Sequence, residues 1–244
     1  MLPFLIVRER AADSFSKWIG SRWFAPNGFS KRAESGKFNG VYLPFWTFDA
    51  VTASRYRGQR GDHYYETVGS GDNRRQEQRT RWSSASGNFQ RVFDDILVVA
   101  THALRRDLVD GLAPWPLQRC IPFRQEVLAG FLARTYDVEL KDGFGEAQGY
   151  INGQIESETR SRIGGDEQVI DDIQTAYGAV TFKHLLLPVW LMAYRYRDRT
   201  YQILVNATTG ELDGERPYSP WKIAAASIAG ALLTIGLIFL ANHR

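Results

Sequence analysis

The sequence predicts an α+β fold made of two related halves, each a helix plus an antiparallel sheet, followed by one C-terminal transmembrane helix. Three observations support this prediction. Two strings recur in the same order in both halves, helical and strand-like patterns alternate in each half, and an uncharged apolar run closes the chain. We expect a first half over 1–110, a second half over 111–220 and an anchor over 221–244.

An internal repeat defines the two halves. The string YLPFW at 42–46 recurs as LLPVW at 186–190, and RYRG at 55–58 recurs as RYRD at 195–198. Both the order and the chemistry of the strings are preserved. We therefore interpret the pattern as a divergent internal duplication.

Each half has a readable order of elements. Apolar residues at helical spacing predict helices over 8–24 and 125–136. Aromatic and β-branched runs that end in turn signals predict long strands that return as hairpins. The expected strands are 41–56 and 62–68 in the first half, and 185–196, 200–205 and 211–215 in the second.

Polar segments connect these elements. Residues 69–88 are rich in Ser, Gly, Asn and Gln, which predicts a mobile loop. Residues 92–101 are expected to enter a buried strand or helix. Residues 156–173 predict a surface helix or loop that is interrupted at Gly164-Gly165.

The C-terminal run predicts a membrane span. Residues 223–241 carry no charge, and at about 1.5 Å per residue they extend roughly 28 Å as a helix, close to the thickness of a bilayer core. Lys222 and Arg244 bracket the run. The alternative is a buried core helix, which the absence of an amphipathic stripe opposes.

The N-terminus sets the expected orientation. MLPFLIVRER has no basic segment before its short apolar run, so it does not predict a signal peptide. We expect a single-pass protein of the inner membrane with a cytoplasmic N-terminal body. Ala226 and Gly230 are spaced to admit a second helix, which predicts a homo-oligomer through the span.

No motif predicts catalysis, a cofactor or a metal. The chain lacks a P-loop, GxSxG and HExxH, and its single cysteine, Cys120, excludes a cysteine zinc site and an intrachain disulfide. Ser14–Lys17 matches SxxK but also fits a helix with Phe15 facing the core. Asp94-Asp95 is either a paired-carboxylate site, which would suit a hydrolase, or a pair of turn or strand-edge residues.

Two groups of arginines are candidate contacts for anionic lipids or phosphates. They are Arg195 and Arg197, and the loop residues Arg74, Arg75, Arg79 and Arg81. The alternative for both groups is a solvated surface, and the loop group adds nucleic acid as a third interpretation. Because residues 1–220 are close to neutral, nucleic acid is not favoured.

Several long strings resemble a known family. These are YLPFWTFDA, RYRGQRGDHYY, FDDILVVAT, TFKHLLLPVWLMAYRYR and VNATTGELDGERPYSPWKI, followed by the terminal apolar run. They resemble a bacterial family of C-terminally membrane-anchored proteins, usually headed by a four-cysteine zinc ribbon and often labelled primosomal protein N′ or superfamily II helicase. The resemblance implies association with SPFH-type and phage-shock-type membrane-stress proteins.

The chain departs from that family at two points. It has no cysteine quartet, so zinc binding does not transfer, and either the ribbon has been lost or the gene begins upstream of Met1. The helicase label does not transfer because no nucleotide site is present. We expect a non-enzymatic, tail-anchored membrane scaffold that binds membrane-stress proteins, with a nucleic-acid-associated factor as the alternative.

Overall fold

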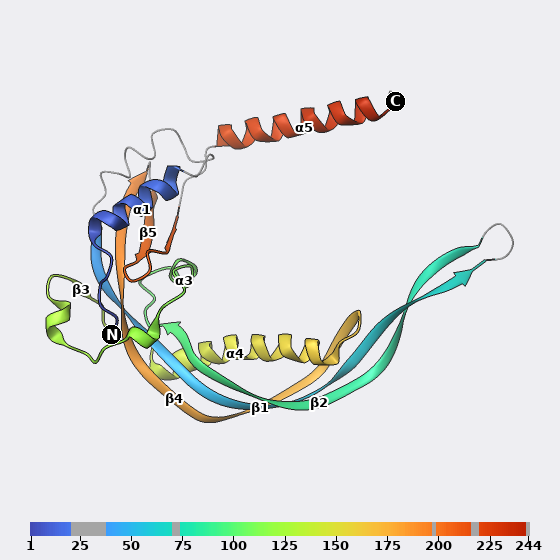
Figure 1. The fold of residues 1–244 in the computed structure, drawn as a ribbon, viewed down its shortest axis with the longest axis horizontal. Coiled ribbons are helices and arrows are strands. Elements are labelled where there is room, and N and C mark those ends of the chain that lie inside the picture. The colour runs from blue at the N-terminus through green and yellow to red at the C-terminus, as the bar shows by residue number, and fades with distance from the viewer. Residues whose placement is uncertain (21–37, 70–73, 197–198, 216–219, 243–244) are drawn as a thin grey trace. The chain divides into compact units, whose positions relative to one another are not determined.

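The computed structural model describes residues 1–20, 38–69, 74–196, 199–215 and 220–242. Antiparallel sheet is the main secondary structure, and helices are few (Figure 1). This finding corrects the predicted α+β class. The physical reason is that segments expected as turns and loops continue as long paired strands.

The bounds of the described elements are as follows. The helices are α1 (Arg8–Gly20), α3 (Arg106–Asp110), α4 (Leu140–Ile163) and α5 (Pro220–Asn242), with 3₁₀ turns η2 (Leu117–Arg119) and η3 (Gln125–Leu128). The strands are β1 (Asn39–Val68), β2 (Arg75–Val99), β3 (Leu132–Ala133), β4 (Glu167–Tyr196), β5 (Arg199–Asn206) and β6 (Leu212–Gly214). Hydrogen bonds order the strands β2-β1-β4-β5-β6, and β3 pairs with β1.

The chain forms two compact units that interleave along the sequence. Unit 1 contains Met1–Pro44, Thr101–Thr135 and Leu186–Arg244, and unit 2 contains Phe45–Ala100 and Tyr136–Leu185. Their boundaries therefore differ from those of the consecutive halves expected from the repeat.

Unit 1 is built around α1 and the β4–β5 hairpin. Phe15 and Ile19 of α1 are buried against Trp190 of β4 and Ile203 of β5. The helix begins where its apolar spacing predicts, and residues 21–24 of the expected helix lie outside the described residues. The return from β4 to β5 and the short β6 also occur where the turn signals predict them.

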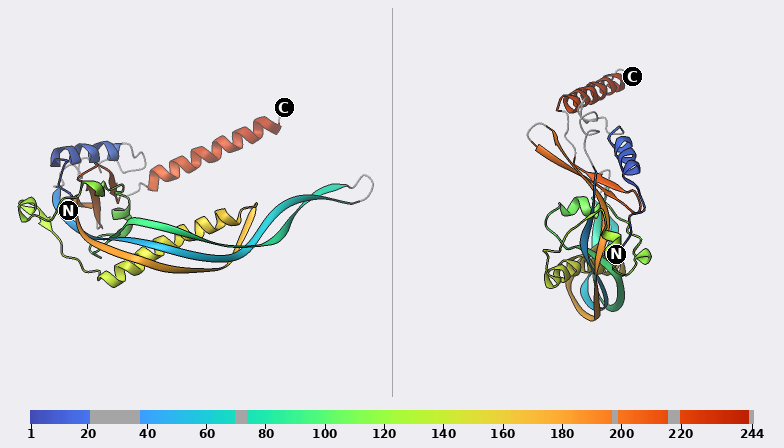
Figure 2. Two further views of the ribbon diagram at one scale, coloured as in Figure 1. Left: turned by 60° about the horizontal axis from the view of Figure 1, so that its bottom comes forward. Right: turned by 90° about the vertical axis from the view of Figure 1, so that its left-hand side faces the viewer.

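Unit 2 is built around α4 and the β1–β2 hairpin. Ile151 and Ile155 on one side of α4 pack against Tyr56 of β1 and against Phe89 and Phe93 of β2. Figure 2 shows α4 lying along one face of these strands. Each unit thus joins a helix from one half of the chain to a hairpin from the other half.

Two tryptophans make equivalent hydrogen bonds in the two units. The indole Nε1 of Trp190 donates to the carbonyl of Ile6 at 2.7 Å in unit 1, and that of Trp46 donates to the carbonyl of Val138 at 2.9 Å in unit 2. Each carbonyl lies two residues before the first residue of a helix, α1 or α4. In each unit, the tryptophan of the repeated string therefore holds the backbone just before the start of a helix.

The turn expected after residue 56 is absent, because β1 continues to Val68. Gly58 and Gly61 suggested that turn, yet both are strand residues at places of close approach. A side chain at Gly58 would collide with the backbone oxygen of Val169, and one at Gly61 would lie 2.9 Å from the ring of Trp82. Glycine here serves close packing of strands.

The mobile loop expected over 69–88 is wrong for most of its length. From Arg75 onward the segment is strand β2, which pairs residue by residue with β1. Residues 70–73 lie outside the described residues. The polar composition fits a strand in which no residue before Phe89 is buried.

The helix expected over 125–136 is also wrong. Only η3 is helical there. It ends at Leu128, and Gly130 has a left-handed φ of 84° two residues later. Phe131 then stacks on Phe4 with ring centres 3.9 Å apart, so its side chain contributes to unit 1 without a helix. The helix of this region is α4, which ends before Gly164 and Gly165 and is followed by β4.

The C-terminal segment forms the helix α5. Within the described part of the chain, no helix combines the length and the apolarity that are needed to cross a membrane. This corrects the expected span over 223–241 and the single-pass inner-membrane localisation. Several side chains of the expected span, from 236 onward among them, lie outside the described residues, as do residues 243–244. Self-association through Ala226 and Gly230 stays a prediction.

The glycines of α4 allow a stability prediction. A Cβ at Gly149 would meet no atom within 4 Å, so Gly149→Ala should raise the free energy of unfolding by about 1 kcal/mol through helix propensity. Gly143→Ala is the matched control, because its Cβ would lie 2.8 Å from the Trp46 ring and should destabilise the protein. Urea unfolding of both variants measures the difference, and equal shifts would contradict the packing described for α4.

Candidate functional site

Strands β1 and β2 of unit 2 expose most of one face. Tyr56 of β1 packs against α4, so Arg55 and Arg57 beside it in sequence lie on the opposite face. All odd-numbered β1 residues from 51 to 59 are exposed. We call this surface the outer face. It comprises Val51, Ala53, Arg55, Arg57, Gln59, Gly61, His63 and Tyr65 of β1 with their β2 partners Val92, Gln90, Asn88, Ser86, Ser84, Trp82, Thr80 and Gln78.

The far end of the outer face carries exposed aromatic side chains. β4 begins at Glu167, which accepts hydrogen bonds from His63 at 2.7 Å and Thr80 at 3.0 Å. Beyond this point β1 and β2 continue without a third described strand (Figure 2). Tyr65 is 66% exposed and Trp82 is 42% exposed. Neither ring is needed for the cores of unit 2.

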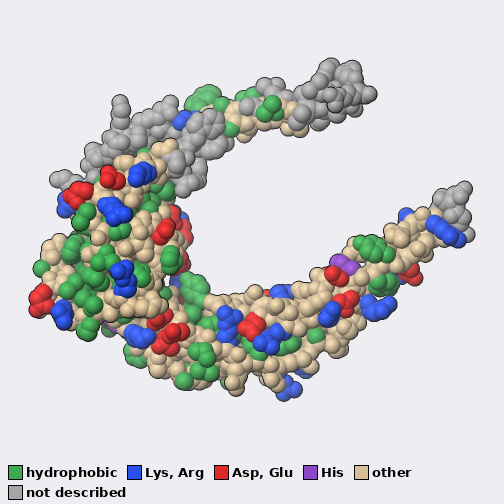
Figure 3. Space-filling model, viewed as in Figure 1, with side chains coloured by type: hydrophobic (Ala, Val, Ile, Leu, Met, Phe, Trp, Pro, Cys, Tyr) green, Lys and Arg blue, Asp and Glu red, His purple; other side chains and the backbone are tan. Residues whose placement is uncertain are grey.

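The arginines of β2 are largely compensated by neighbouring groups. Arg75 and Arg79 form ion pairs with glutamates of the same hairpin at 3.3 and 2.9 Å, and the Arg81 guanidinium lies 5.1 Å from the centre of the Tyr64 ring. Arg74 is exposed just before the strand. Figure 3 shows basic and acidic side chains interspersed along this hairpin. The four arginines therefore do not form a surface of one charge.

The second group of candidate arginines lies in unit 1. Arg195 is exposed on β4 opposite Thr200, while Tyr194 beside it is buried, as strand alternation predicts. Arg197 lies outside the described residues. A role of Arg195 in binding lipid or phosphate stays a prediction.

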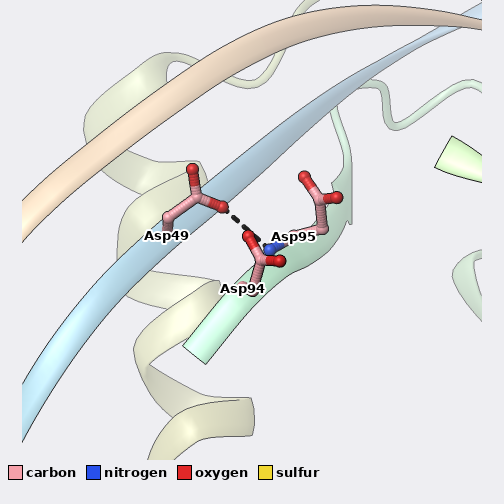
Figure 4. Close-up of side chains that lie close together, drawn as sticks. All are labelled: Asp49, Asp94 and Asp95. Atoms are coloured by element: carbon pink, nitrogen blue, oxygen red, sulfur yellow. Dashed lines mark hydrogen bonds between the residues drawn. The ribbon is translucent and has the colours of Figure 1, made fainter. Parts of the chain in front are cut away.

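A bulge in β2 gathers three carboxylates. The pairing of β1 with β2 shifts register between Phe48 and Ala50, so Asp94 and Asp95 together oppose Asp49. Asp95 has φ 52°, and its N–H donates to Asp49 at 2.8 Å (Figure 4). The three carboxylates offer oxygens within 4.8 Å of one another.

Lys183 compensates this acidic cluster. Its Nζ lies 3.3 Å from Asp49 and 3.1 Å from Asp95, and Thr181 donates a further hydrogen bond to Asp49 at 2.9 Å. Three carboxylate oxygens would suit Mg²⁺ or Ca²⁺. Because the Lys183 ammonium group already pairs with Asp49 and Asp95, we assign no metal to the cluster.

The pKa values of Asp49 and Asp94 shift in opposite directions. A backbone hydrogen bond from Asp95 is the main cause that lowers the pKa of Asp49. A hydrogen bond with Asp49, followed by repulsion from Asp95, raises the pKa of Asp94. No histidine among the described residues contacts the cluster, so the hydrolase interpretation of Asp94-Asp95 gains no support. His184 instead packs 4.8 Å from the Trp46 ring, and burial lowers its pKa.

These shifts predict opposite effects of two conservative variants. Asp94 binds its proton more tightly in the folded state, so its ionisation weakens the fold as pH rises above about 4. Asp94→Asn should therefore stabilise the protein at pH 7, with no difference from wild type below about pH 3. Asp49→Asn removes a charge that the fold stabilises and should cost about 1 kcal/mol at pH 7. Urea unfolding at several pH values tests both, and the same sign for both variants at pH 7 would contradict the assignment.

Sequence reasoning found only part of these sites. Asp94-Asp95 stood out as adjacent carboxylates, but Asp49 and Lys183 join them through cross-strand pairing and were missed. The outer face was missed as well. Its signal in the sequence was the alternation Arg55-Tyr56-Arg57, which the expected turn after residue 56 interrupted.

Comparisons with known proteins add one relative. The chain is 29% identical over 245 residues to YdjG, an uncharacterized protein of Bacillus subtilis (strain 168), and the match covers 98% of this chain and 70% of YdjG. No family model and no solved structure matches the chain. Since YdjG is uncharacterized, the similarity brings no enzymatic activity to this chain.

Proposed function

We propose that this chain is a non-enzymatic scaffold that binds a protein partner through the outer face. The observation that supports this proposal is the set of exposed Tyr, Trp and Arg side chains on a sheet face that no described element covers. Tyr, Trp and Arg are the residue types that dominate the energetics of protein interfaces.

The position of the aromatic residues favours binding over folding as their role. Tyr65 and Trp82 lie where the sheet narrows to two strands, and a two-stranded hairpin gains little stability in water by itself. A partner packed on this end would bury both rings. We take SPFH-type and phage-shock-type membrane-stress proteins as the partner class. The basis is the resemblance of the sequence to the membrane-anchored bacterial family described above, which implies association with these proteins.

The decisive experiment is a binary binding assay. Full-length chain is titrated against a purified SPFH-type protein, and the double variant Tyr65→Ala/Trp82→Ala is compared with the control Phe123→Ala/Tyr150→Ala, which removes exposed aromatics elsewhere. We expect the first variant to weaken binding at least about tenfold and the control to bind as wild type. Equal losses in both variants would reject the outer face, and no binding by wild type would reject this partner class.

Nucleic acid is the second candidate, because arginines and aromatic rings also suit single strands. The glutamates paired with Arg75 and Arg79 weigh against it. Binding of a single-stranded oligonucleotide that falls steeply with salt, and that is lost when Arg74, Arg75, Arg79 and Arg81 become alanine, would favour it over the scaffold. Weak binding independent of salt would remove it.

A further inference from the structure

The middle of the outer face contains a trough with a mixed polar and apolar lining. A hollow of about 560 Å³ crosses all three strands of unit 2. Its lining combines small side chains with longer polar ones. The exposed residues that line it are Ala53 and Arg55 of β1, Asn88 and Gln90 of β2, and Gln174 and Ala176 of β4.

One cation in this trough is not compensated. A second hollow of about 220 Å³ adjoins the first and is lined by Arg55, Arg57, Asp172 and Gln174. Asp172 lies 3.8 Å from Arg57 and accepts a hydrogen bond from Gln174 at 3.0 Å. Among the described residues no carboxylate pairs with Arg55, so its guanidinium is the free charge of the site.

The remaining polar groups also favour an acceptor ligand. Asn88 is the cross-strand partner of Arg55, and Gln90 is two residues further along β2 on the same face. Both side-chain amides can donate N–H groups beside the guanidinium. A planar guanidinium binds a carboxylate through two parallel hydrogen bonds, which a neighbouring amide can supplement.

We infer that the trough binds a carboxylate side chain from an acidic segment of the protein partner, with Arg55 as the principal donor and Asn88 and Gln90 beside it. This inference rests on the proposed function, because it gives the chemistry of the partner at the centre of the same face. The free positive charge of Arg55 selects an acidic segment over a basic or purely apolar one.

The test uses defined probes and the full chain labelled with ¹⁵N. An acetylated, amidated hexapeptide of alternating Glu and Asp is titrated, and its Gln/Asn counterpart serves as the neutral probe. We expect the acidic probe alone to shift the side-chain amide signals of Asn88 and Gln90. Equal shifts from the neutral probe, or shifts from inorganic phosphate without shifts from the acidic peptide, would overturn the inference.

Variants of the two charged residues Arg55 and Asp172 should have opposite effects on binding. Arg55→Gln should weaken binding of the acidic probe at least about tenfold, whereas Arg10→Gln on α1, an exposed control in unit 1, should leave it unchanged. Asp172→Asn removes the negative charge beside Arg57 and should tighten binding about threefold or more. Unchanged affinity in both Arg55→Gln and Asp172→Asn would overturn the inference.

Failure of this inference can be separated from failure of the proposed function. If the acidic probe does not bind while partner binding still depends on Tyr65 and Trp82, the trough assignment fails and the scaffold stands. Suppose instead that the acidic probe binds through Arg55 but partner binding does not depend on Tyr65 and Trp82. The assignment of the trough is then supported, and the proposed role of the two aromatic residues in the interface is rejected.

Discussion

Replacing Trp46 with alanine should lower the free energy of unfolding by about 3–5 kcal/mol. The Trp46 side chain is 6% exposed and packs with Phe48, Val98 and Ala147 in a core of unit 2. Alanine would leave a cavity there and would also remove the donor to the carbonyl of Val138. Urea unfolding followed by circular dichroism measures the loss.

A second variant separates the two contributions. Trp46→Phe keeps an aromatic ring but removes the indole N–H, so it should cost less than alanine, about 1–3 kcal/mol. If Trp46→Phe were as damaging as Trp46→Ala, the hydrogen bond to Val138 would outweigh the packing. If both variants unfolded like wild type, the core described around this residue would be wrong.

Replacing Asn206 with alanine should cost about 3 kcal/mol. Asn206 is fully buried at the end of β5, where its Nδ2 donates to the carbonyl of Leu112 at 3.0 Å. Its Oδ1 accepts the N–H groups of Thr208 and Thr209 at 2.9 and 3.1 Å. Alanine would satisfy none of these three backbone groups, and an unsatisfied buried group costs about 1–3 kcal/mol.

The neighbouring Thr209 provides the control. Its side chain is exposed and accepts one hydrogen bond, from the N–H of Glu211 at 3.3 Å. Thr209→Ala should therefore change the free energy of unfolding by about 0.5 kcal/mol at most. Similar losses in Asn206→Ala and Thr209→Ala would show that the turn as a whole, and not the buried amide, stabilises unit 1.

The sequence predicted those elements whose signals are local. The apolar spacing around Phe15 gave α1, and the turn residues after 206 gave the end of β5 and the start of β6. The alternation in Tyr194-Arg195 correctly separated a buried side chain from an exposed one. In each case, nearby residues determine the structure without help from the rest of the chain.

The secondary-structure predictions were wrong where contacts with distant strands outweigh the local residue composition. Ser, Gly, Asn and Arg between 75 and 88 predict a loop, yet β1 supplies hydrogen-bond partners along the whole segment. Such residues suit a strand when one of its faces meets water. The part of helix α4 before residue 156 was missed for a related reason. Its glycines have poor helix propensity, and the burial of Ile151 and Ile155 offsets that cost only once β1 and β2 are in place.

The candidate sites follow the same rule. A pair of adjacent aspartates can be seen in the sequence, but the distance from Lys183 to Asp95 depends on which strands meet. The uncompensated charge of Arg55 likewise depends on the position of Asp172 beside Arg57. Which charges meet across neighbouring strands depends on the register of those strands, and no local sequence pattern gives that register.

The interleaving of the two units has a consequence for synthesis of the protein. Ile6 precedes α1, yet the Trp190 indole that binds its carbonyl lies 184 residues later. At a translation rate of about 5–20 residues per second, β4 and β5 are synthesised roughly 10–40 seconds after α1. The apolar side of α1 has no strands to pack against during that time. Unit 1 therefore completes its core only after β4 and β5 have been synthesised. A nascent chain that pauses before β4 would present Phe15 and Ile19 to chaperones and proteases.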